Sequence, residues 1–120
     1  ELWELSRAGK WFRFAGKKQV ITENEPGHSF FFLAEGQVKV TKQGRLLNML
    51  DKKEFFGEMA YIRGGALPRH ATVEATVQLL LAEFEPAALD NMSTSAQLQL
   101  TRALVRNLAE RLELANTRLK

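Results

Sequence analysis

The segment FFGEMAYIRGGALPRHATV, residues 55–73, joins a short aromatic stretch, a glycine, a carboxylate and a run of good helix formers. This order predicts a strand that is followed, after Gly57, by a short helical turn. The first amides of such a turn lack partners within the helix and carry the positive end of its dipole, so they can hold an anion such as phosphate. Pro68 and Arg69 then lead into a further strand, which we expect over residues 70–76.

Short apolar stretches on both sides of this segment are separated by Gly, Pro and Asn, a pattern typical of antiparallel β structure. Val38 and Val40 alternate with polar residues, which indicates one inward face and one face toward water. Regularly spaced strands with glycine-rich turns favour a sandwich, a jelly roll or a small barrel, and the periodicity does not choose among them. The expected strands are residues 10–14, 19–22, 30–33, 37–41, 45–50, 70–76 and 78–84.

Helical periodicity marks both ends of the chain. A short helix is expected over residues 1–9, because its apolar residues recur at helical spacing before a glycine. After Pro86 the pattern is helical to the end, with a break at residues 93–95. Thr94 followed by Gln97 predicts a capping box at the start of the second of these two helices.

The last helix carries apolar residues at intervals of seven, which is the spacing of a coiled-coil seam. These residues are Leu98, Val105, Leu112 and Leu119. The stripe either packs on the strands of its own domain or contacts a second subunit in a homodimer, and the spacing leaves both open. A neighbouring face carries Leu100, Leu104 and Leu114, so the helix has residues for both contacts.

The composition is that of one folded, soluble domain rather than a disordered or fibrous chain. The 120 residues are 45% hydrophobic and 26% charged, enough for a single core. No apolar run approaches the roughly 20 residues of a membrane helix, and cysteine is absent, which favours the cytoplasm. Because the chain begins with Glu1 and ends within a helical pattern, we expect a piece of a longer protein whose effector domain is unknown.

Glu58 and Arg69 are the candidate binding residues. The planar guanidinium of Arg69 can donate two parallel hydrogen bonds to phosphate oxygens. A carboxylate beside an anion is explained if the ligand also carries hydroxyls, because Glu58 can accept a hydrogen bond from a ribose 2′-OH. Taken alone, the two residues are better explained as an ordinary surface ion pair.

The quoted segment resembles the phosphate-binding cassette of the cyclic-nucleotide-binding domains, which occur in protein kinase A regulatory subunits and the bacterial catabolite activator protein. The matching motifs are Phe56-Gly57-Glu58, Met59-Ala60, Pro68-Arg69 and Ala71-Thr72-Val73, with Gly36-x-Val38-x-Val40 before them. The resemblance covers nearly the whole chain and implies a mainly β fold, an eight-stranded antiparallel β-roll or jelly roll with flanking helices. Residues 1–9 would form the leading helix, 10–85 the roll with its cassette at 55–73, and 86–120 the hinge and lid helices.

For the site, the resemblance implies Arg69 on the cyclic phosphate and Glu58 on the ribose. Gly57 would let the phosphate approach, and backbone amides would complete its cradle, from Met59 or Ala60 and from His70 or Ala71. Asn116 and Thr117 of the lid helix would contact the base. Domains selective for cGMP often carry Thr at the position of His70, which favours cAMP as the ligand over cGMP.

Other functions fit the sequence less well. A cupin-like metal barrel needs several converging ligands, but His28 and His70 are the only histidines, so neither a metal nor catalytic residues are expected. The net charge of +3 does not by itself indicate binding to nucleic acid. In the related transcription regulators a helix-turn-helix module follows the last helix, so no DNA contact is expected from this segment. The whole protein could still be a cAMP-responsive transcription regulator. A ligand-free roll that serves as an interaction or dimerisation module is a further alternative, against which the presence of Glu58 and Arg69 argues.

Overall fold

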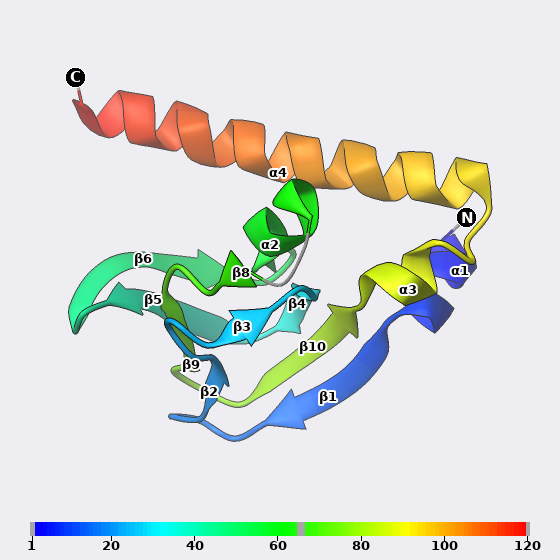
Figure 1. Cartoon of the computed structure of the whole chain (residues 1–120). Coiled ribbons are helices and arrows are strands. Elements are labelled where there is room, and N and C mark those ends of the chain that lie inside the picture. Colours follow the sequence, from blue (N-terminus) through cyan, green and yellow to red (C-terminus); the bar gives the residue numbers. More distant parts are fainter. Residues whose placement is uncertain (1, 65–66, 120) are drawn as a thin grey trace.

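The strands expected from the sequence form two four-stranded antiparallel sheets in the computed structural model, which describes residues 2–64 and 67–119 (Figure 1). The first sheet has the order β1 (Lys10–Phe14), β10 (Leu79–Phe84), β4 (Phe30–Glu35) and β7 (Phe55–Phe56). The second has the order β2 (Gln19–Ile21), β9 (Thr72–Ala75), β5 (Gln37–Lys42) and β6 (Arg45–Asp51). The predicted antiparallel roll is therefore confirmed, although the described residues form more than the predicted eight strands. In the described part of the chain a short pair, β3 (Pro26–Gly27) with β8 (Leu67–Pro68), joins it.

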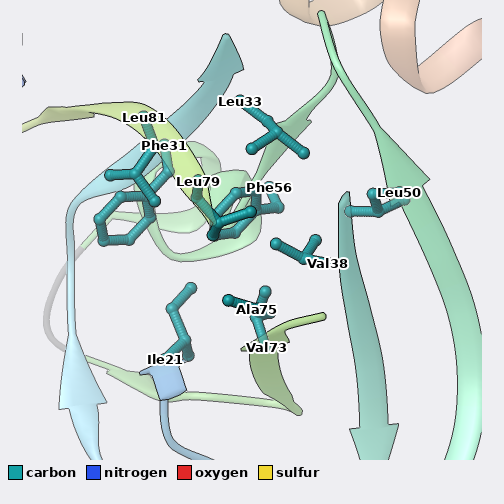
Figure 2. Close-up of a cluster of buried hydrophobic side chains, with 10 residues drawn as sticks. All are labelled: Ile21, Phe31, Leu33, Val38, Leu50, Phe56, Val73, Ala75, Leu79 and Leu81. Carbon is teal, nitrogen blue, oxygen red and sulfur yellow. The ribbon is translucent and has the colours of Figure 1, made fainter. Parts of the chain in front are cut away.

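Strand β4 is buried on both faces, because the second sheet covers one side of it and the helices cover the other. Successive residues of a strand point to opposite faces. Phe31 and Leu33 accordingly belong to the cluster between the two sheets, whereas Phe30 and Phe32 belong to a second cluster beneath the helices. Figure 2 shows the cluster between the sheets, which consists of Ile21, Phe31, Leu33, Val38, Leu50, Phe56, Val73, Ala75, Leu79 and Leu81.

Four helices accompany the roll in the described residues: α1 (Leu2–Ala8), α2 (Glu58–Arg63), α3 (Pro86–Leu89) and α4 (Thr94–Leu119). Leu100 and Leu104 of α4 are buried at 4% exposure in the second cluster, as one face of the helix was predicted to be. In the same cluster the rings of Phe30 and Phe84 stack at 5.2 Å between centroids. Helix α4 lies along one side of the molecule in Figure 1. None of the described helices is long and apolar enough to cross a membrane.

The stripe of apolar residues at intervals of seven does not pack on the roll. Leu98, Val105 and Leu112 are 50%, 60% and 64% exposed, while the side chain of Leu119 lies outside the described residues. Leu114, which the sequence groups with Leu100 and Leu104, does not share their burial, because it is 53% exposed. The roll-facing contact of α4 is made earlier in the helix, where buried residues recur at three- and four-residue spacing.

Helix α4 is capped by Ser93, one residue before the predicted Thr94. The Oγ of Ser93 accepts a hydrogen bond from the backbone N of Ala96 at 3.1 Å, and Thr94 is already helical. The side chain of Gln97 donates to the carbonyl of Met92 at 3.0 Å rather than closing a capping box. The prediction was wrong because adjacent Ser and Thr residues offer equivalent caps, and only the entry of the chain into the helix selects one.

Glu4 of α1 ties the first helix to this cap. Its carboxylate accepts hydrogen bonds from the backbone N of Ser93 at 3.0 Å and from the Ser93 hydroxyl at 2.9 Å. Chiefly through the backbone bond, and then through the hydroxyl, this contact lowers the pKa of Glu4 from 4.5 to about 2. An ionised carboxylate on α1 therefore contacts the residue that caps the start of α4.

Replacing Glu4 by glutamine is expected to flatten the pH dependence of the unfolding free energy. A folded-state pKa of about 2 against 4.5 means that the stabilisation is complete above pH 4.5 and is lost as the pH falls toward 2. Urea denaturation between pH 6 and pH 2.5 measures the difference, with the exposed Glu113→Gln as the matched control. If wild type and Glu4→Gln lose stability in parallel across this range, the contact does not contribute.

Candidate functional site

The segment at residues 55–73 begins as predicted, with a short strand, a glycine and a single short helix. Strand β7 ends at Phe56, Gly57 adopts φ of 77°, and α2 begins at Glu58. This left-handed conformation favours glycine. A Cβ at Gly57 would also lie 3.0 Å from the Cδ1 of Ile21 and 3.2 Å from the Nη1 of Arg69. Gly57 thus allows α2 to start directly beside the Arg69 guanidinium.

A cavity of about 280 Å³ lies between α2, the loop after β8 and the inner face of the second sheet. Its lining includes the seven residues predicted to hold phosphate and ribose, namely Gly57, Glu58, Met59, Ala60, Arg69, His70 and Ala71. Its apolar wall comes from strands β2, β5, β6 and β9. The fold therefore gathers residues from both ends of the segment around one space.

Arg69 is held in place by backbone carbonyls. Its Nη1 donates to the carbonyl of Gly57 at 3.2 Å, and its Nη2 donates to the carbonyl of Ser29 at 2.8 Å. Burial lowers the pKa of Arg69, and the charge of Glu83 acts in the opposite direction. A Cβ on Gly27 would lie 2.4 Å from the Nε of Arg69, so only glycine leaves room for this guanidinium.

Glu58 is paired with Arg111 of α4, a partner that the sequence analysis missed. The Nη1 of Arg111 donates to the Oε1 of Glu58 at 2.8 Å, and its Nε donates to Glu54 at 3.4 Å. Its Nη2 donates to the carbonyl of Phe55 and, at 3.0 Å, to the Oδ1 of Asn107. The Glu58 side chain is 6% exposed and that of Arg111 23%, so the pair is largely removed from water.

The sequence did contain a signal for Arg111 and Asn107. Residues three and four apart share one face of a helix. Leu100, Leu104, Asn107 and Arg111 form such a series, so polar side chains replace leucine on the stripe that faces the roll. Polar groups on a buried stripe require hydrogen-bond partners. Asn107 finds one in the backbone N of Phe55, at 2.9 Å from its Oδ1.

Asn116 and Thr117, the residues predicted to contact the base, do not line the cavity. Both are exposed on α4. The hydroxyl of Thr117 donates to the carbonyl of Glu113 at 2.9 Å, within the helix. Of the described residues of α4, Arg111 alone lines the cavity. A base contact by Asn116 or Thr117 stays a prediction, and it would need α4 to move or another chain to take part.

A larger hollow of about 600 Å³ lies between α1, β1 and α4. Its surface is mainly apolar, and its charged side chains, those of Lys53, Arg106 and Glu110, are all exposed rather than buried among partners. The smaller cavity, with its buried carboxylate and immobilised guanidinium, is therefore the candidate site. Within residues 2–64 and 67–119, no three His, Cys, Asp or Glu side chains gather in a way that could hold a metal ion.

The geometry of this cavity agrees with the comparison of the chain with known families. Residues 11–95, more than half of the chain, match the family model of the cyclic nucleotide-binding domain. The chain belongs to this family. In a cyclic nucleotide-binding domain, a carboxylate, a guanidinium and helix amides around one cavity are suited to the hydroxyl and phosphate groups of such a ligand.

Known proteins similar to this cyclic nucleotide-binding domain include kinases and their regulatory subunits. A cAMP-dependent protein kinase regulatory subunit from Debaryomyces hansenii is 38% identical over 65 residues, which are 53% of this chain and 14% of the relative. A cGMP-dependent protein kinase from Plasmodium berghei is 36% identical over 76 residues, 63% of this chain and 9% of the relative. The chain thus spans a small part of the relatives that it matches.

The fold has a close counterpart among solved structures. A cyclic nucleotide-binding domain from Methylobacillus flagellatus superposes with a TM-score of 0.82 at 22% identity, covering 95% of this chain and 67% of that one. At this identity the likeness concerns the fold alone. It agrees with the two-sheet roll and the flanking helices described above.

Proposed function

We propose that this cyclic nucleotide-binding domain is a regulatory sensor that binds a cyclic mononucleotide, with cAMP preferred over cGMP. The observation that carries the proposal is that Glu58, Arg69 and the first residues of α2 line one cavity. A guanidinium and free amides suit the cyclic phosphate, and the carboxylate suits the ribose hydroxyl. The presence of His70, where cGMP-selective domains often carry threonine, supports cAMP.

The charges around the cavity favour an anionic ligand. Glu58 is already compensated by Arg111, so its carboxylate does not repel an incoming anion as an isolated charge would. The Arg69 guanidinium is bound only to carbonyl and hydroxyl oxygens of Ser29 and Gly57. Its Nε–H and one Nη1–H have no acceptor in the described part of the chain. These donors are available to a phosphate.

The Arg111 contact supports a route from the ligand to α4. A ribose hydroxyl that binds Glu58 shares the carboxylate with Arg111, so occupancy of the cavity changes the energy of the contact that holds α4 to the roll. A ligand shifts such an equilibrium only by its differential affinity, typically about 1–3 kcal/mol. We propose that the shift of α4 is passed to an attached effector domain or to a second subunit.

Titration calorimetry with cAMP, 2′-deoxy-cAMP, cGMP and 5′-AMP tests the proposed ligand. We expect cAMP to bind more tightly than cGMP, because of His70. The 2′-deoxy compound should bind more weakly than cAMP, because it lacks the hydroxyl for Glu58. Linear 5′-AMP, with its additional charge and open phosphate, serves as the control and should bind weakest. The proposal is wrong if no cyclic nucleotide binds at millimolar concentration, and a tighter cGMP complex would contradict only the preference.

The exposed stripe on α4 supports a homodimer. Leu98, Val105 and Leu112 recur every seven residues and are each at least half exposed, although large apolar side chains at such spacing normally pack. The stripe faces away from the buried residues of α4, so a second copy of the helix can reach it. We therefore place the contact between subunits on this face.

Replacing Leu112 by glutamate is expected to convert such a dimer into monomers, because two buried like charges would face each other across the seam. Leu114→Glu is the matched control. Leu114 is also exposed, but it lies two residues, or about 200°, further around the helix. Sedimentation velocity at tens of micromolar distinguishes the two variants. A wild-type chain that is monomeric at this concentration would rule out the seam.

A further inference from the structure

One row of side chains crosses the inner face of the second sheet and forms the wall of the cavity. The pairing of the strands places Ile21 opposite Val73, Val73 opposite Val40 and Val40 opposite Asn48. All four side chains line the cavity. The wall is therefore apolar across β2, β9 and β5, and it ends in a single amide on β6.

Asn48 breaks the pattern of its own strand. Leu50, two residues later, lies in the core between the sheets at 3% exposure, and residues two apart in a strand face the same side. Asparagine is depleted in strands, and a polar group on an inward face is unfavourable unless it is hydrogen-bonded. Departures of this kind from the local pattern are expected at functional positions.

The amide of Asn48 is only partly used within the protein. Its Oδ1 accepts a hydrogen bond from the backbone N of Met49 at 2.9 Å. In the described part of the chain, its Nδ2 has no acceptor. Because no buried side-chain nitrogen or oxygen among the described residues lacks a partner, this NH2 group is accessible from the cavity. It is a donor that is available to a ligand.

We infer that Asn48 reads the base of the bound cyclic nucleotide, an inference that rests on the function proposed above. With phosphate and ribose at Arg69 and Glu58, the base is the part of the ligand left to meet the wall. A base has apolar faces and a polar edge, which match a row of valines that ends in an amide. The Nδ2 of Asn48 donates to an acceptor on that edge, such as N7 of a purine or O6 of guanine.

This assignment moves base recognition from α4 to strand β6. The side chain of Asn48 already lines the cavity, whereas neither Asn116 nor Thr117 does. It also distinguishes two functions within one cavity. The segment at residues 55–73 binds the sugar phosphate that all cyclic nucleotides share, and β6 supplies the contact that depends on the base.

Replacing Asn48 by leucine tests the assignment, because leucine keeps the volume and removes the donor. Three probes are titrated by NMR chemical shifts, which follow millimolar affinities: cAMP, cGMP and methyl riboside 3′,5′-cyclic phosphate, which has the same sugar phosphate without a base. We expect the affinity for the base-bearing ligands to fall by about three- to tenfold, the effect of one neutral hydrogen bond. The affinity for the methyl riboside should stay within about twofold, because its contacts are untouched.

Two further measurements separate a ligand contact from a structural role. Asn91→Leu is the matched control, since Asn91 is exposed after α3 and does not line the cavity, so all three affinities should be unchanged. Asn48→Leu should unfold at the same or a higher temperature than wild type, because it completes the apolar wall.

The outcomes that overturn the assignment are distinct. An equal loss for all three ligands, or no loss for any, shows that Asn48 does not read the base. A lower unfolding temperature for Asn48→Leu shows that the amide serves the fold instead. If the wild-type chain binds none of the three probes, the proposed function itself is wrong and this assignment falls with it.

Discussion

Replacing Arg69 by alanine is expected to lower the affinity for cAMP by roughly tenfold to several hundredfold, the scale of charge-assisted hydrogen bonds lost from a partly desolvated site. The guanidinium supplies a positive charge at the cavity that is not held in a salt bridge among the described residues, whereas Arg111 is already engaged by Glu58. Arg69→Lys should fall between wild type and alanine, because lysine keeps the charge but not the planar fork. Titration calorimetry measures all three proteins.

A second variant separates the position of the guanidinium from its charge. Gly27→Ala places a Cβ 2.4 Å from the Nε of Arg69, which is too close, and so displaces the side chain without removing it. We expect a smaller loss of affinity than for Arg69→Ala. Because Arg69 also donates to the carbonyls of Ser29 and Gly57, melting curves must show that each variant is folded. Unchanged affinity in folded Arg69→Ala would refute the phosphate contact.

Replacing Arg111 by methionine is expected to lower the unfolding free energy by about 3 kcal/mol, because it leaves the carboxylate of Glu58 buried without a partner. The carbonyl of Phe55 also loses a donor. The partial exposure of Arg111, 23%, places the effect at the lower end of the range for buried pairs. Urea denaturation at neutral pH measures the change.

The double variant Arg111→Met with Glu58→Gln tests whether the unpaired charge is the cause. Part of the lost stability should return, because the double variant no longer buries a charge. Arg102→Met is the control, since Arg102 lies on the exposed side of α4 and should matter little. If Arg111→Met is as stable as Arg102→Met, water screens the pair in solution and the link between the cavity and α4 is weak.

The strands were predictable because their signals are local. Strand β1 has the predicted bounds, and β5 and β6 each extend one residue further than expected. Strand β9 is shorter, Thr72–Ala75 instead of residues 70–76, because His70 and Ala71 line the cavity before the pairing with β5 begins at Thr72. Alternation defined which residues face inward, and turn residues defined where the strands end. Which strands pair in the two sheets was not predicted, because the pattern within a strand does not specify its partner.

The residues that α4 contributes were not predictable in the same way. Each residue along a helix turns the side chain by about 100°, so a small error in the placement of α4 exchanges one face for another. Asn116 and Thr117 were predicted to contact the base, but neither residue lines the cavity. Leu114 was placed with Leu100 and Leu104, but it is exposed.

The segment at residues 55–73 by itself determined the candidates for phosphate and ribose, because Gly57, Glu58 and Arg69 belong to one short stretch that folds back through the pairing of β3 and β8. Only the tertiary structure decided what surrounds them. Arg111 meets Glu58 from 53 residues away. Asn48 joins the wall of the cavity because three other strands pair beside it. Contacts of this kind depend on how a helix crosses the roll and on the register of the sheet, which no local pattern specifies.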